Sequence, residues 1–185
     1  MIFLAVVLGF IVLVVVAVIG MYNALVGLRN QVKNAWSQID VQLKRRHDLI
    51  PNLIETAKGY MKHEQTLLEN VTKARAEAVQ ATGVRSQAKA EDSLSQNLRS
   101  LFAVFENYPD LKANQNMLAV QEELSSTENK ISFARQHYND EVMSYNTGIE
   151  SIPTNVLAGL FHFGKEEFFE LEDASERKNV KVSFS

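Results

Sequence analysis

The stretch LKRRHDLIPNLI, residues 43–54, decides whether the chain continues as one helix or turns back. It places Pro51 and three consecutive cations inside a long helical pattern. Apolar residues recur seven apart from Leu25 to Ala74, and this row keeps its phase across the proline. A loop normally disrupts such a phase, whereas a helix supported by its neighbours can bend at a proline and continue. We therefore predict one helix over residues 25–80, kinked at Pro51, with a break at the proline as the alternative.

An uncharged apolar segment, MIFLAVVLGFIVLVVVAVIGM, precedes this pattern. About 20 apolar residues span the ~30 Å hydrocarbon core of a bilayer as a helix. A cleaved signal peptide is the alternative, but no Lys or Arg precedes Arg29, and AVIGM is a poor cleavage site. Residues 1–24 are therefore predicted to be a single-pass transmembrane anchor. The cations that follow, Arg29, Lys33 and the run 44–46, favour a cytoplasmic rather than an extracytoplasmic location for the soluble domain.

Two more helices and a tail are expected after residue 80. Gly83 suits the end of the first helix, and the second is predicted over about residues 86–107. The corner NYPD then leads, at Pro109, into a third helix over about residues 110–150. The predicted fold is all-α: a single N-terminal transmembrane helix, then an elongated antiparallel bundle of three long helices (residues 25–150), then an aromatic-rich C-terminal extension (residues 151–185) that begins with a short helix.

The third predicted helix carries an apolar row beside a mostly polar one. Tyr138 and Tyr145 belong to the apolar row, whereas Asn114, Glu128 and Arg135 belong to the polar row. Buried polar groups must be hydrogen-bonded, and polar core positions can fix the register between helices. We expect Glu128 and Arg135 to be at least half buried and paired, either within the bundle or with a neighbouring chain. A ligand site at these residues is the alternative.

Charge and composition exclude several classes of protein. Residues 29–62 hold seven cations and three anions, whereas residues 109–150 hold three cations and seven anions. These segments are expected to attract each other, or the matching segments of a neighbouring chain. The absence of a large basic patch argues against nucleic acid as a partner. With no cysteine, no helical zinc or di-iron motif and no glycine-rich phosphate loop, the sequence predicts neither catalysis nor a cofactor or metal.

The predicted helix lengths also favour self-association. If the third helix packs antiparallel to the second, it extends well beyond it, and Tyr138, Val142 and Tyr145 continue the apolar seam along the overhang. An apolar seam exposed to water usually marks an interface. We therefore predict a homo-oligomer with its anchors side by side. The competing explanation is that residues 152–169 fold back and cover the seam within one chain.

Several long motifs resemble those of one known family. They include AWSQIDVQLKRRHDLIPNLIETAKGYMKHE, YPDLKANQNMLAVQEELSSTENKISFARQHYND and IPTNVLAGLFHF, and together they cover almost the whole chain. The sequence is similar to the LemA family of bacterial membrane proteins, which is related to the magnetosome-membrane MamQ proteins. The resemblance implies an N-terminal anchor and a helical bundle, but the family has no agreed activity. The family-motif, packing and interface candidates are Tyr22, Asn23, Trp36, Arg45, Pro51, Asn52, Tyr108, Pro109, Asn114, Glu128, Arg135, Tyr138, Asn139, Tyr145, Asn146, Pro153 and Phe161.

The leading hypothesis is a scaffold anchored in the bacterial inner membrane. It would self-associate there and organise membrane or partner proteins without catalysis. Its expected partners are other copies of itself, the bilayer through residues 1–24, and another membrane protein. A second hypothesis is an adaptor for a membrane protease or a signalling protein. A third is a bundle that binds a ligand near Glu128 and Arg135.

Overall fold

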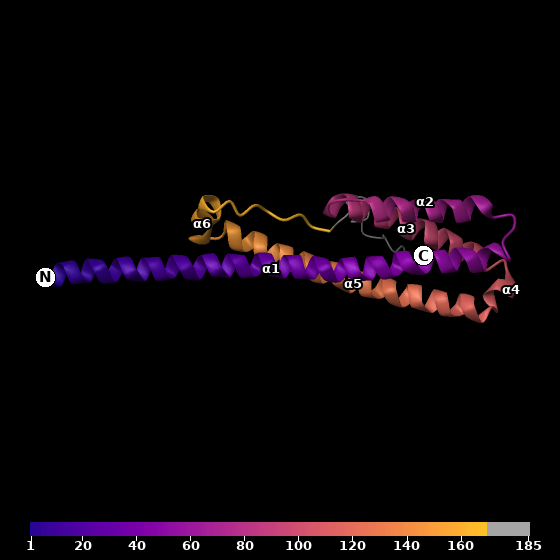
Figure 1. Cartoon of the computed structure of the whole chain (residues 1–185), viewed down its shortest axis with the longest axis horizontal. Helices are drawn as coiled ribbons and strands as arrows, with labels where there is room; N and C mark the ends of the chain where they lie inside the picture. The colour runs from indigo at the N-terminus through magenta and orange to yellow at the C-terminus, as the bar shows by residue number, and fades with distance from the viewer. Residues whose placement is uncertain (170–185) are drawn as a thin grey trace, which may run out of the picture.

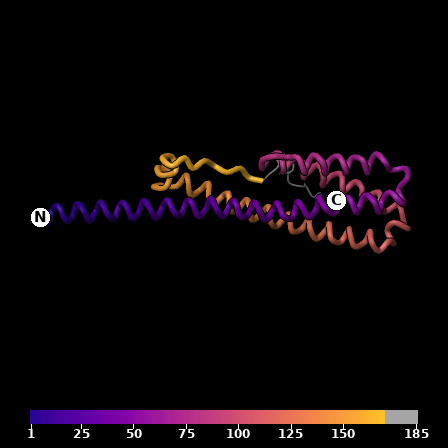
Figure 2. The backbone as a smooth tube through the Cα atoms, in the orientation of Figure 1, coloured from indigo at the N-terminus to yellow at the C-terminus, as the bar shows by residue number. Residues whose placement is uncertain are grey.

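The computed structural model describes residues 1–169, and this part of the chain is helical and without strands, as the sequence predicts (Figure 1). One very long helix, α1, runs the length of the molecule, and the other helices fold back along it, leaving its N-terminal part alone (Figures 1 and 2). The part of the expected C-terminal extension after residue 169 lies outside the described residues. The helices are α1 (Ile2–Lys58), α2 (Gln65–Gln80), α3 (Val84–Phe105), α4 (Pro109–Lys112), α5 (Gln115–Glu150) and α6 (Thr154–Leu160).

Helix α1 joins the apolar N-terminal segment to the bundle without a break. Its 57 residues correspond to a length of about 85 Å at 1.5 Å per residue. By length and composition, α1 is the one helix among residues 1–169 that is suited to cross a membrane. The side chains of residues 1–17 are exposed, and Leu25 is the first buried residue. The apolar segment therefore makes no contribution to the core of the bundle.

Pro51 lies inside α1, so the prediction of a helix on both sides of this proline is confirmed. A proline within a helix has no N–H to donate to the carbonyl four residues earlier. That carbonyl belongs to His47, and Arg75 of α2 donates to it from Nε at 2.6 Å. The neighbouring helix thus supplies the hydrogen bond that the proline removes, which explains why α1 continues.

The prediction of one helix over residues 25–80 is wrong, because α1 ends at Lys58 and α2 begins at Gln65. Between them the chain turns back, and α2 packs antiparallel to the end of α1 (Figure 1). Tyr60 falls on the predicted apolar row but is 40% exposed, whereas its neighbour Met61 enters the core. The unchanged phase across this turn was therefore a coincidence of spacing. Within residues 1–169 the bundle consists of four helices, α1, α2, α3 and α5, in place of the three predicted.

Two buried clusters form the core. The distal cluster lies where α1, α2, α3 and the start of α5 meet, around residues such as Leu53 and Leu101. The second cluster lies nearer the apolar segment, mainly between α1 and α5, around residues such as Ile39 and Tyr138. The predicted corner at Pro109 is confirmed, although it forms the short α4 before α5 begins. Asn114 caps α5 by accepting hydrogen bonds from two backbone N–H groups of its first turn.

Helix α5 returns along α1 rather than extending beyond the bundle. Gly148 lies so close to α1 that an added Cβ would come within 2.8 Å of Leu28 Cδ1. Tyr138, Val142 and Tyr145 are at most 2% exposed, covered by α1 and by the chain after α6. The expected exposed seam does not exist, so the argument that derived self-association from it was wrong.

Candidate functional site

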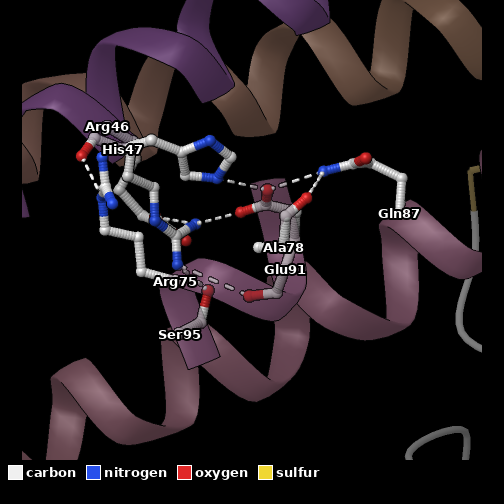
Figure 3. Close-up of polar contacts among 8 residues, drawn as sticks. Arg46, His47, Arg75, Ala78, Gln87, Glu91 and Ser95 are labelled. Carbon is white, nitrogen blue, oxygen red and sulfur yellow. Dashed lines mark hydrogen bonds and ion pairs between the residues drawn. The ribbon is translucent and has the colours of Figure 1, made fainter. Parts of the chain in front are cut away.

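A cluster of buried charged groups lies where α1, α3 and α5 meet (Figure 3). Arg46 and His47 come from α1 and Glu91 from α3, and these residues are 2%, 8% and 4% exposed. Ionisable groups are rarely buried to this extent unless they are paired. We call these three residues the charged cluster.

Arg46 connects three helices through its guanidinium group. Nη1 lies 3.0 Å from Glu128 Oε2 on α5 and 3.6 Å from Glu91 Oε2 on α3. Nη2 donates to Ser95 Oγ at 2.7 Å and to the Glu91 backbone carbonyl at 3.4 Å. The planar guanidinium with its several donors suits such a junction. Arg46 therefore holds α1 in register with both α3 and α5.

Glu91 is the anion at the centre of the charged cluster. Its Oε1 lies 2.7 Å from His47 Nε2 and accepts a hydrogen bond from Gln87 Nε2 at 2.9 Å (Figure 3). An ionised carboxylate only accepts hydrogen bonds, so Nε2 carries the imidazole hydrogen in this contact. Gln87 also donates to the Ala78 carbonyl at 3.0 Å, which links α3 to the end of α2.

The chemistry of this cluster is structural pairing. Each charged group faces a group of opposite charge or a hydrogen-bond partner within the protein. No group of three or more His, Asp or Glu side chains that could hold a metal ion occurs in residues 1–169. Buried pairs of this kind often specify which helices pack together and in which register. The arrangement therefore favours a role in fixing the bundle.

Glu128 and Arg135 do not form a common site. Glu128 has a side chain that is 49% exposed and pairs with Arg46. Arg135 is partly buried, and its guanidinium carbon lies 5.0 Å from the centre of the Phe169 ring. The two side chains thus serve different contacts, one with α1 and one with the chain after α6.

A second notable arrangement holds the chain after α6 against α5. Tyr138 and Asn139 are followed seven residues later by Tyr145 and Asn146 on the same helix, and residues seven apart lie on one face. We call these four residues the tail clasp. They contact residues 164–169, an extended segment that runs back along the bundle (Figure 2).

Each asparagine of the tail clasp forms two hydrogen bonds to the backbone of one residue. Its side-chain nitrogen donates one, and its side-chain oxygen accepts the other. Asn146 donates to the Glu166 carbonyl at 2.9 Å and accepts from the Glu166 N–H at 3.0 Å. Asn139 makes the same pair of bonds to Phe169, at 3.4 Å and 2.8 Å. An asparagine side chain thereby takes the place of a neighbouring β-strand for this segment.

The tyrosines of the tail clasp donate to backbone carbonyls between and beside these residues. The Tyr138 hydroxyl donates to Glu167 and the Tyr145 hydroxyl to Gly164, both at 2.9 Å. Burial, together with the nearby negative charge of Glu166 and Glu167, raises the pKa of Tyr138 to about 12. Burial and Glu166 also raise the pKa of Tyr145. Both phenols therefore remain hydrogen-bond donors to a higher pH than an exposed tyrosine would.

The remaining sequence candidates occupy separate places. Trp36 packs edge-on against Tyr138 at 5.4 Å between ring centres, and Tyr22 packs against Phe161 at 4.8 Å. Arg45 forms an ion pair with Glu123, and the Tyr108 hydroxyl lies 3.3 Å from Glu64 Oε1. Four other candidates are exposed to solvent: Asn23, Pro51, Asn52 and Pro153.

The charged cluster was missed by sequence reasoning, although one signal was present. Arg46 stands on the apolar row of α1 between Ile39 and Leu53, where a cation is out of place unless it is paired. Glu91 stands three residues before Leu94, on the inner face of α3. Two opposite charges at core positions of different helices could have suggested the pair.

The sequence matches known proteins over most of its length. The sequence model described as "LemA family" matches residues 35–184. Protein LemA of Metamycoplasma hominis is 29% identical over 168 residues, which cover 90% of this chain and 75% of that protein. Magnetosome protein MamQ 2 of Paramagnetospirillum magneticum is 23% identical and is covered over 66% of its length. Magnetosome protein MamQ of Magnetospirillum gryphiswaldense is 22% identical, with the same coverage.

Proposed function

Because the chain belongs to the LemA family, we propose that it is a membrane-anchored helical scaffold that self-associates at the membrane without catalysis. Its role is to hold copies of itself, and proteins attached to them, at a fixed height above the bilayer. The similarity to magnetosome proteins supports a function in organising a cellular structure. The cations Arg29 and Lys33 beside the apolar segment support a bundle on the cytoplasmic side of the bacterial inner membrane.

The continuity of α1 is the observation that carries this proposal. The helix passes from the apolar segment into the bundle with no linker, and α5 packs along it from Leu25 onwards. A flexible linker would leave the bundle free to change its orientation relative to the anchor. A helix clamped in this way transmits the orientation of the anchor to the bundle, which is the property that a scaffold requires.

The outer face of α5 is the surface proposed for self-association. Leu118, Phe133 and Met143 are 48%, 73% and 56% exposed. Their spacings of 15 and 10 residues place them on one face of a helix with 3.6 residues per turn. Apolar side chains on a shared face favour contact with another protein.

The anchor adds a geometric reason for contact between copies. All copies inserted in one bilayer in the same direction carry Phe133 at the same height. A two-fold axis along the membrane normal would then bring the same face of two chains together, as symmetric dimers require. This argument concerns the outer face of α5 and is independent of the buried seam.

Cysteine cross-linking in native membranes tests this proposal. The chain has no cysteine, so Phe133→Cys introduces a single reactive thiol on the α5 face. We expect this variant to form cross-linked dimers, while Lys73→Cys, whose site on α2 is 79% exposed, serves as the control and forms few. Equal cross-linking at both sites, or none at either, would contradict self-association. A cross-link from position 133 to a different protein would support the adaptor hypothesis instead.

A further inference from the structure

The segment around α6 is unusual because it is both uncharged and exposed. Residues 151–164 contain no Asp, Glu, Lys or Arg. An ion pair between Glu150 and Lys165 closes this segment at its two ends. Between them, Ile152, Val156 and Leu160 are 87%, 71% and 67% exposed. A soluble domain rarely directs such a group of large apolar side chains to water.

These side chains form one stripe that points away from the bundle. Val156 and Leu160 are spaced four apart in α6, which places them along one side of the helix, and Ile152 lies exposed in the turn that precedes it. On the other side, Leu157 and Ala158 are buried against the bundle. The short helix is therefore amphipathic, with its outer side unpartnered within residues 1–169.

Helix α6 lies close to the apolar segment of α1. It lies at the end of the bundle nearest the apolar half of α1, and beyond it α1 continues alone (Figures 1 and 2). Phe161 directly follows α6 and packs edge-on against Tyr22 of α1, with ring centres 4.8 Å apart. Phe163 packs against the same tyrosine at 5.7 Å.

The length of the anchor determines where the contact with Tyr22 lies relative to the bilayer. The apolar residues 2–21 span about 30 Å as a helix, which is the thickness of the hydrocarbon core. Tyr22 then falls at the membrane–water boundary, where tyrosine and tryptophan are enriched. The next cation, Arg29, lies only 5.1 Å from the centre of the Phe163 ring and marks the aqueous side. The segment that touches Tyr22 is therefore level with the lipid headgroups.

We propose that α6 and its flanking residues, Ile152 to Phe161, lie in the interface of the bilayer that holds the anchor. The exposed stripe inserts among the upper acyl chains, while Leu157 and Ala158 remain packed on the bundle. This second contact fixes the tilt and rotation of the bundle with respect to the membrane. The inference rests on the proposed function only in requiring residues 1–24 to cross a bilayer.

Fluorescence of site-specific labels in reconstituted vesicles tests the proposal. Single-cysteine variants of the full chain, each labelled with a polarity-sensitive fluorophore, are placed in phosphatidylcholine–phosphatidylglycerol vesicles. We expect the Val156→Cys label to show blue-shifted emission that is strongly quenched when brominated lipids replace ordinary ones. A label at Lys73→Cys on α2 is the matched exposed control, and we expect neither effect there.

A label within the anchor separates failure of this inference from failure of the proposed function. The Val12→Cys label must be quenched by brominated lipids wherever the anchor is inserted. If it is quenched while the Val156→Cys label is not, the inference about α6 is overturned and the anchor stands. If neither label is quenched, both the anchor and the inference are overturned. A blue shift at position 156 without lipid quenching would assign α6 to a protein contact and would also overturn the inference.

Discussion

Replacing Arg46 by alanine is expected to lower the free energy of unfolding by about 3–5 kcal/mol, the range found when one partner of a buried ion pair is removed. The substitution leaves the Glu91 carboxylate, which is 4% exposed, without its cation. It also removes the bond to Ser95 and the ion pair with Glu128, and so loosens α1 from both α3 and α5. Denaturant titration of the full chain in detergent, followed by the fluorescence of Trp36, measures the loss.

Arg45 provides the matched control for this prediction. It is the same residue type at the next position of α1, but its side chain is 51% exposed and its partner Glu123 is 37% exposed. Ion pairs at this exposure contribute about 0–1 kcal/mol, so Arg45→Ala should change stability little. Replacing both partners, Arg46→Met with Glu91→Leu, should restore part of the loss, since no unpaired charge stays buried. Equal losses in the two single arginine variants would contradict a structural role for the charged cluster.

The double variant Asn139→Ala, Asn146→Ala is expected to release residues 164–169 from α5. It removes four hydrogen bonds to the backbone of this segment, worth about 2–4 kcal/mol at roughly 0.5–1 kcal/mol each. Hydrogen exchange at the amides of Glu166 and Phe169 should then accelerate strongly. The emission of Trp36, which packs 5.8 Å from the Phe169 ring, should shift to the red as water reaches it.

Asn129→Ala is the control for the tail clasp, because Asn129 lies on the same helix and is exposed. It should leave both the exchange rates and the emission of Trp36 unchanged. Slow exchange at Glu166 and Phe169 in the double variant would mean that packing of Phe169, which is 1% exposed, holds the segment without the asparagines.

Local signals in the sequence were sufficient for most of the secondary structure. The uncharged segment forms part of a helix, as expected from its own length and composition. Gly83 and Pro109 act through the backbone of a few residues, and the chain turns at each. The continuity of α1 at Pro51 also followed from local periodicity. Its physical cause, the bond from Arg75 to the His47 carbonyl, depends on α2 and could not be derived without the turn that brings α2 back.

The misjudged features all depend on contacts between distant residues. The turn after Lys58 begins at Gly59, a residue that often follows the end of a helix, but Met61 keeps an apolar residue in the core there, so the periodic pattern alone did not reveal the turn. The opposite charges of residues 29–62 and 109–150 attract each other within one chain, through Arg45 with Glu123 and Arg46 with Glu128. Charge balance alone does not distinguish this pairing from pairing between copies.

The tail clasp shows how a repeated motif can be visible while its role is not. The Tyr-Asn pairs at positions 138 and 145 were both among the candidates, and their seven-residue spacing placed them on one face. Their partners are backbone groups of residues 164–169. Nearly every residue carries the same backbone groups, so the amino-acid sequence does not reveal these contacts. Such a partner becomes evident only when the path of the chain is known.

The central claim is that the anchor and the part of α1 within the bundle form one continuous rigid helix. The distance between spin labels at Gly9→Cys and Gln38→Cys, measured in the full chain in a bilayer, tests this claim most directly. The 29 residues between these positions correspond to about 44 Å along an α-helix at 1.5 Å per residue. The account predicts a narrow distribution of distances near this value. A broad distribution centred on shorter distances would mean that a flexible joint separates the anchor from the bundle, and would contradict the account.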